Sequence, residues 1–231
     1  KKYIIPITDN TSFDLLKRIR LNDNSFFVSA NAGEIDMTKY RPYYSANNSG
    51  KRILTGAQVL RYSTTTNPSQ GSVIFLDNVF FNSLSIRRNT VDKKRIVMQR
   101  ITGVDSNRRL IMTIIDKGLL CANSTNYISK DFEFSLEYVL GLFNSRFINY
   151  YFKMTSTNTN ITTSEINSIP IPVNPGQEYQ LISSLVDRIL TAKKANPQAD
   201  TNALEAEIDQ LVYELYGLTD EEIEIVEESV G

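Results

Sequence analysis

The stretch that decides the fold class is SLEYVLGLFNSRFINYYFKM, residues 135–154. Its apolar residues recur every three or four positions, which is the spacing of one face of a helix. The members of this stripe are Leu136, Val139, Leu140, Phe143, Phe147 and Tyr151. Short β-rich segments precede the stretch and helical segments follow it, so we expect one helix here that packs on a sheet.

Upstream of residue 135, the sequence predicts one short helix and then a strand-rich region. TSFDLLKRIR, residues 11–20, begins with a Thr/Ser cap signal and has helical spacing. Turn clusters at 45–50, 63–71 and 103–107 separate runs rich in β-branched and aromatic residues. These predicted strands cover residues 25–30, 51–56, 59–63, 72–77, 79–86, 95–102 and 109–115. We expect mixed or antiparallel sheets.

Downstream, the polar stretch 155–164 predicts a loop, and IPIPV, residues 169–173, predicts an extended connector. Residues 178–194 and 200–217 predict a helical hairpin whose second helix ends at Gly217. Thr219 and Glu222 form a capping-box pattern for a last helix over 219–229. The expected class is α+β, with one domain over 1–175, β-rich to about residue 130, and an acidic helical hairpin and tail over 176–231.

Composition excludes several kinds of chemistry. The chain has 231 residues, 41% of them hydrophobic, with Cys121 as its single cysteine and no histidine. An internal disulfide and a Cys/His zinc site are therefore excluded, and we expect the reducing cytoplasm as the compartment. No apolar run approaches 18 residues, so no membrane span is predicted. The first residue, Lys1, suggests a fragment of something longer.

Charge is distributed unevenly along the chain. Residues 1–130 hold 20 lysines and arginines against 9 acidic residues, a net +11, whereas residues 131–231 hold 5 against 17, a net −12. A basic half joined to an acidic half favours a polyanionic partner bound by one side only. The alternative is that two solvated surfaces simply differ in sign.

Several segments, in this order, resemble the TaqI-like C-terminal specificity domain of adenine-specific DNA methyltransferases and single-chain restriction-modification enzymes. GEIDMTKYRPYYS at 33–45 leads into KRILTGAQVLRY, where Gly56, Val59, Arg61 and Tyr62 match a Gly-x-x-(Ile/Val)-x-Arg-Tyr pattern. Residues 95–116, 121–128, 136–153 (with Phe143-Asn144-Ser145), 166–173 and 208–223 are similar to the blocks that follow. The order and spacing of these blocks over most of the chain carry the resemblance.

The resemblance implies sequence-specific recognition of duplex DNA by residues 1–130. It also implies a separate upstream domain that flips out an adenine and methylates N6 with S-adenosylmethionine. This chain lacks the Asn-Pro-Pro-Tyr type motif and a Gly-rich turn for the methyl donor, so we expect no catalytic residue, no cofactor and no metal in it. The C-terminal helices would contact the methyltransferase domain or another subunit.

Two alternatives stay open: a specificity subunit of a multisubunit restriction-modification system, and a protein-protein scaffold without DNA binding. A nuclease is disfavoured because no Asp-x-Lys or Glu-x-Lys follows a predicted strand.

Arginine, lysine, asparagine and glutamine are the side chains best suited to phosphates and base edges. The candidate DNA-binding residues are Lys51, Arg52, Arg61, Tyr62, Arg87, Arg88, Lys93, Lys94, Arg95, Gln99, Arg100, Asn107, Arg108, Arg109, Asn123 and Asn126. The 87–95 cluster is predicted to hold phosphate rather than to read bases. Arg61 and Tyr62 fit either a readout contact or a structural strand end, and their place in the recurring pattern slightly favours the structural role. Short polar residues such as Asn123 more often cap backbone.

Overall fold

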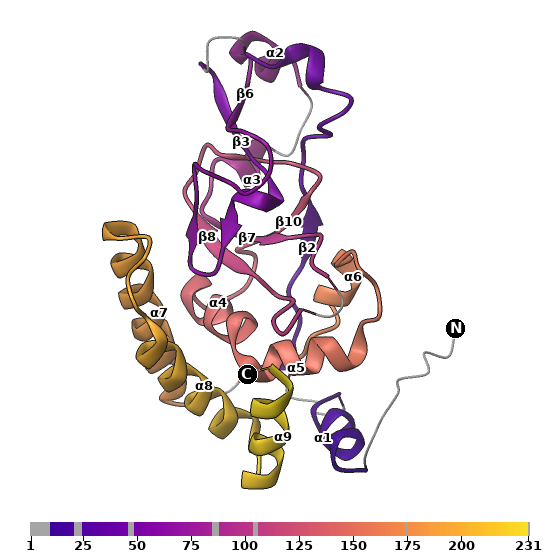
Figure 1. The fold of residues 1–231 in the computed structure, drawn as a ribbon, viewed down its shortest axis with the longest axis vertical. Helices are drawn as coiled ribbons and strands as arrows, with labels where there is room; N and C mark the ends of the chain where they lie inside the picture. Colours follow the sequence, from indigo (N-terminus) through magenta and orange to yellow (C-terminus); the bar gives the residue numbers. More distant parts are fainter. Residues whose placement is uncertain are drawn as a thin grey trace.

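The computed structural model describes residues 10–20, 25–45, 49–84, 88–103, 106–173 and 175–230, without the side chains of residues 10, 88 and 89. The predicted α+β class is confirmed. Sheets occupy the middle and one end of the molecule, and helices gather at the other end and along one side (Figure 1). Within the described residues, no helix is both long and apolar enough to cross a membrane.

The main sheet is antiparallel throughout and has the strand order β2-β10-β7-β8. Its strands are β2 (Ala30–Ala32), β10 (Thr125–Ser129), β7 (Arg95–Gln99) and β8 (Met112–Ile115). Two ribbons flank it: β4 (Val59–Leu60) with β5 (Ser63–Thr64), and β1 (Ser25–Phe26) with β11 (Ile171–Pro172). The connector predicted at 169–173 therefore contains strand β11, which pairs with β1, the first strand of the chain.

A second, mixed sheet has the order β6-β3-β9. The central strand β3 (Lys51–Leu54) is antiparallel to β6 (Ile74–Leu76) and parallel to β9 (Leu120–Cys121). With α2 (Asn78–Ser83) and α3 (Arg88–Val91), this sheet encloses its own small core. The core residues are Ile35, Ile53, Leu76, Phe81, Val91, Leu120 and Ala122. We call this unit the β3 lobe; it forms the upper end of the molecule in Figure 1.

The remaining helices surround the lower end of the main sheet in Figure 1. They are α1 (Asn10–Arg20), α4 (Leu136–Asn144), α5 (Arg146–Thr155), α6 (Thr163–Ile166), α7 (Glu178–Ala195), α8 (Asn202–Tyr216) and α9 (Asp220–Val230). Single 3-10 turns lie at Arg41–Tyr43 and Gly56–Gln58. One hydrophobic core runs from the main sheet through α4 and α5 to α7, α8 and α9.

The strand expected over 59–63 is instead the tight hairpin of β4 and β5, which turns at Tyr62 with a left-handed φ of 58°. Two further predicted elements are wrong. The single helix expected over 135–154 is interrupted at Ser145, whose ψ of 156° ends α4 while its hydroxyl accepts a hydrogen bond from Ile148 N and caps α5. The strand expected over 79–86 is instead helix α2 in its described part, because the Asp77 carboxylate caps the turn by accepting from Phe80 N at 2.9 Å. In both places a local cap overrides the apolar pattern.

The C-terminal predictions are confirmed. Helices α7 and α8 form the expected hairpin, and Gly217 ends α8 in the left-handed conformation with φ 62°. Thr219 and Glu222 make the predicted capping box at the start of α9. The hairpin shares its core with α4. Because Gly141 of α4 has no side chain, the side chains of Ile182 and Val186 can pack directly against the α4 backbone.

Candidate nucleic-acid interface

The connection between β7 and β8 is held on the polar loop that precedes α6. Arg109 is 1% exposed and donates from Nη1 to Ser156 O and Oγ, both at 3.2 Å, and from Nη2 to Asn158 O. The carboxylate of Glu165 fixes the same loop by accepting from the side chains of Ser156 and Asn158. The polar stretch predicted as a loop therefore holds the side chain of Arg109 in place.

Two buried asparagines attach the other side of this connection to the helices. Asn144 pairs with both backbone groups of Met112, since its Oδ1 accepts from Met112 N at 3.2 Å and its Nδ2 donates to Met112 O at 3.1 Å. Asn149 Oδ1 accepts from Leu110 N at 2.8 Å. Asn144 thus satisfies both backbone groups of Met112 at the start of β8, and Asn149 holds Leu110, two residues before it.

Three arginines then meet two acidic residues of α8 at the edge of the main sheet. Arg61 donates from Nη1 to Asn144 O at 2.6 Å and pairs through Nη2 with Glu205. Arg108 Nη1 lies 3.9 Å from the same Glu205 carboxylate, and Arg146 binds Asp209 through its backbone N at 2.8 Å and its Nε at 3.4 Å. We call Arg61, Arg108 and Arg146 the arginine cluster.

Electrostatics in this cluster follow from burial and proximity. Burial lowers the pKa of Arg108, and the neighbouring charge of Arg61 lowers it further. Burial alone would raise the pKa of Glu205, but the charge of Arg61 and its hydrogen bond hold it below the ordinary value. Asp209 is 4% exposed, and burial raises its pKa. The cluster is thus partly shielded from water by helix α8.

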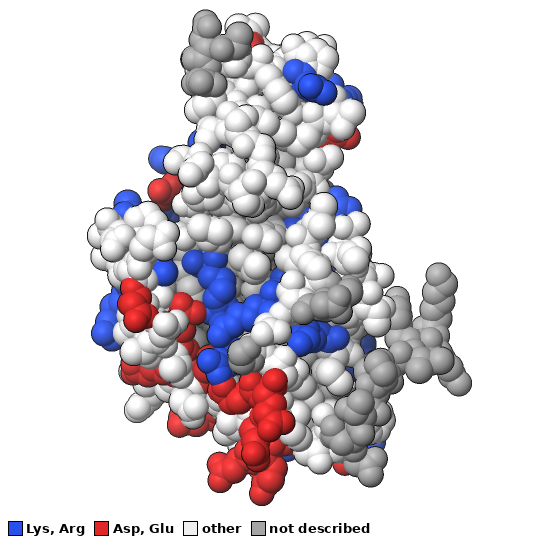
Figure 2. Space-filling view, viewed as in Figure 1, with Lys and Arg blue, Asp and Glu red and all other residues white. Residues whose placement is uncertain are grey.

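The face of the molecule drawn in Figure 2 shows lysine and arginine gathered at its centre, at the level of the lower ends of β7 and β8, bordering acidic surface that belongs to the helices. Other predicted residues line this end of the sheet. Gln99 Nε2 donates to Val59 O at 2.7 Å, and Arg100 Nη1 donates to Asn123 O at 3.0 Å. Asn107 is exposed in the β7–β8 connection.

Four candidate residues do not lie on any accessible surface, and this corrects the predicted set. Tyr62 is 2% exposed, while Arg95, Arg109 and Asn126 are each 1% exposed. Arg95 pairs with Glu34 Oε1 at 2.8 Å and donates to Leu119 O at 2.7 Å. Asn126 Nδ2 donates to Ile161 O at 2.8 Å. Their polar groups serve the fold, so we remove them from the residues proposed to contact DNA.

The other candidates fall into three groups. Lys93 and Lys94 are exposed beside β7, and Lys94 makes only a 3.9 Å contact with Asp116. Lys51 and Arg52 are half-buried on β3, where Lys51 Nζ lies 5.2 Å from the centre of the Phe81 ring. Arg87 and the side chain of Arg88 fall outside the described residues.

The acidic residues that complete the site were not expected there. The candidate residues included no acidic side chain, but Glu205 and Asp209 of α8 face the arginine cluster, and Asp209 is buried. The available signal was their spacing: residues four apart lie on one face of a helix. Asn144 could have been proposed as a site residue from the sequence, because it belongs to the Phe143-Asn144-Ser145 block that carried the family resemblance.

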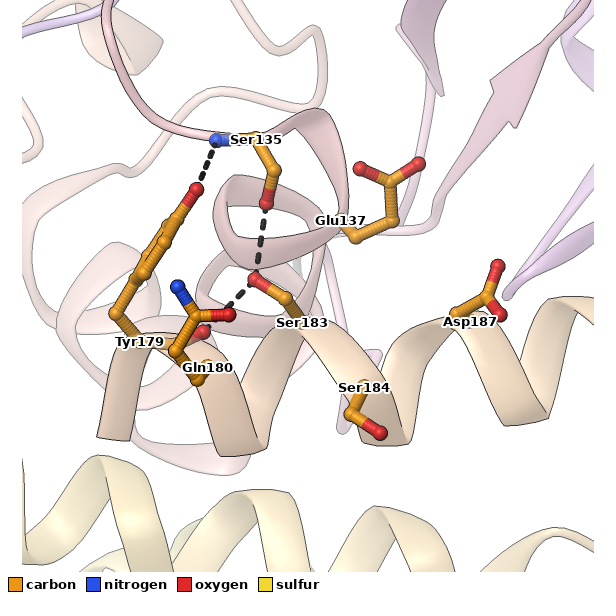
Figure 3. Close-up of a pocket in the computed structure, with 7 residues that line it drawn as sticks. All are labelled: Ser135, Glu137, Tyr179, Gln180, Ser183, Ser184 and Asp187. Carbon is orange, nitrogen blue, oxygen red and sulfur yellow. Dashed lines mark hydrogen bonds between the residues drawn. The ribbon is translucent and has the colours of Figure 1, made fainter. Parts of the chain in front are cut away.

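A shallow polar depression lies between the start of α4 and the first turns of α7 (Figure 3). Tyr179 OH accepts from Ser135 N at 3.2 Å, the hydroxyls of Ser135 and Ser183 lie 2.9 Å apart, and Ser183 donates to Tyr179 O at 2.8 Å. These groups cap α4 and join it to α7. Across the described ranges, no group of three or more Cys, Asp or Glu side chains is arranged to hold a metal ion.

The family model of the TaqI-like C-terminal specificity domain matches residues 51–171, which is more than half of the chain. The chain belongs to this family of specificity domains. The matched range contains the whole β3 strand, the β7–β8 connection and the two asparagines that support it. The family resemblance predicted from the ordered blocks is therefore confirmed.

Among solved structures, the chain is similar in fold to the one titled "Structure of Type IIL restriction-modification enzyme MmeI in complex with DNA has implications for engineering of new specificities". The TM-score is 0.51 at 11% sequence identity, over 91% of this chain. The match covers 36% of that chain, so this protein spans about a third of the length of the enzyme it resembles. A comparison with curated protein sequences gives no match.

Proposed function

We propose that this chain is the duplex-DNA target-recognition module of a restriction-modification enzyme. One observation carries the proposal. Arg108 lies in the β7–β8 connection with its side chain 24% exposed, and the carboxylate nearest to it, that of Glu205 at 3.9 Å, is already paired with Arg61. A partly exposed guanidinium that shares its counter-charge with another arginine is suited to an incoming phosphate or base edge. The family match and the fold shared with a DNA-bound enzyme support this assignment.

The whole enzyme would divide the work between domains. This chain would select the site on DNA, and a methyltransferase domain outside it would bind S-adenosylmethionine and methylate adenine N6 in the cytoplasm. The exposed acids of α8, such as Glu207 and Glu214, leave a negative surface that would contact that domain or another subunit. A specificity subunit of a multisubunit system would use the same DNA-binding surface.

A scaffold without DNA binding is the second candidate, and one observation favours it. Glu205 already neutralises Arg61 and approaches Arg108, so part of the basic charge is balanced inside the chain. If all of it were balanced in this way, salt-dependent binding of a polyanion would be absent.

The decisive experiment is a titration of the chain with a randomised duplex library at two salt concentrations, followed by sequencing of the retained pool. We expect salt-dependent binding with a log-log slope of roughly −4, as for about five neutralised phosphates, and enrichment of a short motif. Arg108→Ala should weaken binding about tenfold. The matched control is Arg188→Ala on the exposed face of α7, which should bind as the parent does.

Each outcome separates the candidates. Binding without enrichment would mean that base reading needs the methyltransferase domain, and the module would then supply only phosphate contacts. Absence of binding at low salt would refute the proposal and leave the scaffold as the better account.

A further inference from the structure

Residues 100–102, which follow β7, pair with residues 159–161 of the polar loop before α6. Ile101 lies opposite Asn160 in an antiparallel bridge. In a pair flanked by hydrogen bonds on both sides, the two side chains project from the same face, with their β-carbons about 5 Å apart. We call these six residues the short ribbon. The flanking bonds run from Ile161 N to Arg100 O at 2.7 Å and from Thr102 N to Thr159 O at 3.4 Å.

The two faces of the short ribbon differ in exposure. On the inner face, Thr102 is 6% exposed and Ile161 is fully buried. On the outer face, Ile101 is 64% exposed beside the exposed Asn160. Water-facing positions of a ribbon normally carry polar side chains, so an isoleucine there leaves apolar surface in water. The short ribbon therefore presents one apolar and one polar side chain together at the protein surface.

The loop strand of the short ribbon is anchored at both ends. Just before it, the buried Arg109 donates to the carbonyl oxygens of Ser156 and Asn158. At its end, Ile161 O accepts from Asn126 Nδ2 at 2.8 Å. The backbone that carries the outer pair is therefore fixed before a partner binds, and a side chain branched at Cβ, such as isoleucine, adds few rotamers. Both features lower the entropic cost of binding.

The outer pair has the chemistry that recognises adenine opposite thymine. In the major groove, an A·T base pair presents an acceptor and a donor on adenine, N7 and N6, and the 5-methyl group on thymine. The Asn160 amide supplies the matching donor and acceptor, and it has no hydrogen-bond partner among the described residues. Ile101 offers an apolar surface to the methyl group. A two-stranded ribbon fits the width of the major groove, and the short ribbon continues into the connection that holds Arg108.

We propose that Ile101 and Asn160 together read one A·T base pair in the major groove. Asn160 hydrogen-bonds to N6 and N7 of the adenine, and Ile101 contacts the 5-methyl group of the thymine. A G·C pair offers neither the methyl group nor the adenine donor, so the outer pair discriminates against it. This inference rests on the proposed function and deepens it by naming two specificity-determining residues, neither of which the sequence pointed to.

The test uses two randomised duplex libraries, one made with thymine and one with uracil in its place. Uracil keeps every hydrogen-bonding group of thymine and lacks only the 5-methyl group. The full chain selects from each library, and the retained pools are sequenced. We expect a motif with one A·T pair whose enrichment falls about fourfold in the uracil library, as for one methyl group removed from an apolar contact. This comparison uses the unaltered chain, so it does not depend on the folding of any variant.

Variants then assign the contacts to the two side chains. Ile101→Ala should weaken enrichment of that A·T pair about fourfold in the thymine library and show no further loss with uracil. Asn160→Ala should weaken the same pair about tenfold in both libraries. Both positions are exposed, so both variants should melt within about 2 °C of the parent. The matched control is Leu181→Ala, an exposed apolar residue on α7, which should select the parent's motif.

Three results would overturn the inference. One is a parent motif that is equally enriched in the thymine and uracil libraries. Another is a folded Ile101→Ala or Asn160→Ala that selects the parent's motif unchanged, or two variants that alter different base pairs. The third is salt-dependent binding by the parent without any enriched motif, which leaves DNA binding itself intact. Absence of binding by the parent at low salt would instead refute the proposed function.

Discussion

The β-rich half and the helical region of this protein use charged side chains in different ways. In the β-rich half, Arg95 and Arg109 are buried; Arg95 binds Glu34, and Arg109 binds carbonyl oxygens of the loop that precedes α6. In the helical region, most acids stay exposed, but Glu205 and Glu222 reach back to Arg61 and Arg18 of the other half. The charge difference between the two halves of the sequence therefore overstates the unpaired charge on their surfaces, because some basic and acidic side chains form ion pairs where the two halves meet.

The largest effect is expected inside the β-rich half, at the buried pair of Arg95 and Glu34. Their side chains are 1% and 6% exposed, so Glu34→Gln leaves a buried guanidinium without its counter-charge. We expect a loss of about 4 kcal/mol in the free energy of unfolding, measured by urea denaturation.

The matched control is Asp116→Asn, which breaks the exposed pair with Lys94 and should cost less than about 0.5 kcal/mol. Equal effects at the two sites would contradict the view that burial of the pair makes it structural.

A smaller effect is expected inside the helical region, where packing rather than charge joins the elements. A Cβ added to Gly141 of α4 would lie 2.6 Å from Ile182 Cγ2 and 3.0 Å from Val186 Cγ2 of α7. Gly141→Ala should therefore cost about 2 kcal/mol in urea denaturation, although alanine favours the helix itself.

Ile182→Ala removes the nearest obstructing methyl group, so the double variant should be more stable than the sum of the two single changes predicts. Strict additivity would show that α4 and α7 separate freely at this point, which would contradict the close approach.

The helices of the C-terminal region were easier to predict from the sequence than the strands of the β-rich half. Helical spacing, Gly217 and the Thr219/Glu222 box are local signals, and the helices α7, α8 and α9 follow them closely. Residues 79–86 have a strand-like composition, yet the single cap at Asp77 makes their first part helical. Ser145 acts similarly within the predicted long helix. Local rules therefore predicted the helical region well and strand positions less well.

Site residues were harder to predict because partners come from distant parts of the chain. Nothing in the sequence around Arg61 shows that Asn144 and Glu205 will surround it. The sequence did identify the basic half, the family and the β7–β8 connection. Which arginines serve the fold is decided by tertiary contacts that composition does not contain.

The smallest of these stability effects is expected where the two regions meet, at Glu205, and it depends on pH. The pKa of Glu205 lies below its ordinary value of 4.5 in the folded chain, so its contribution to stability is present above that value and is lost as the pH falls through the lower, folded pKa. Glu205→Gln should cost about 1 kcal/mol at pH 7. Below about pH 4.5 the parent should lose stability faster than the variant, and the difference between them should shrink.

Thermal unfolding at pH 7 and at several values below 4.5 measures this difference, with Glu207→Gln as the control on the exposed face of the same helix. The control should follow the parent at every pH, because Glu207 makes no ion pair with the described residues. A Glu205→Gln variant that tracks the parent in acid would mean that the two halves are joined by packing alone. The negative charge of α8 would then be available to a partner, and the arginine cluster would be available to DNA.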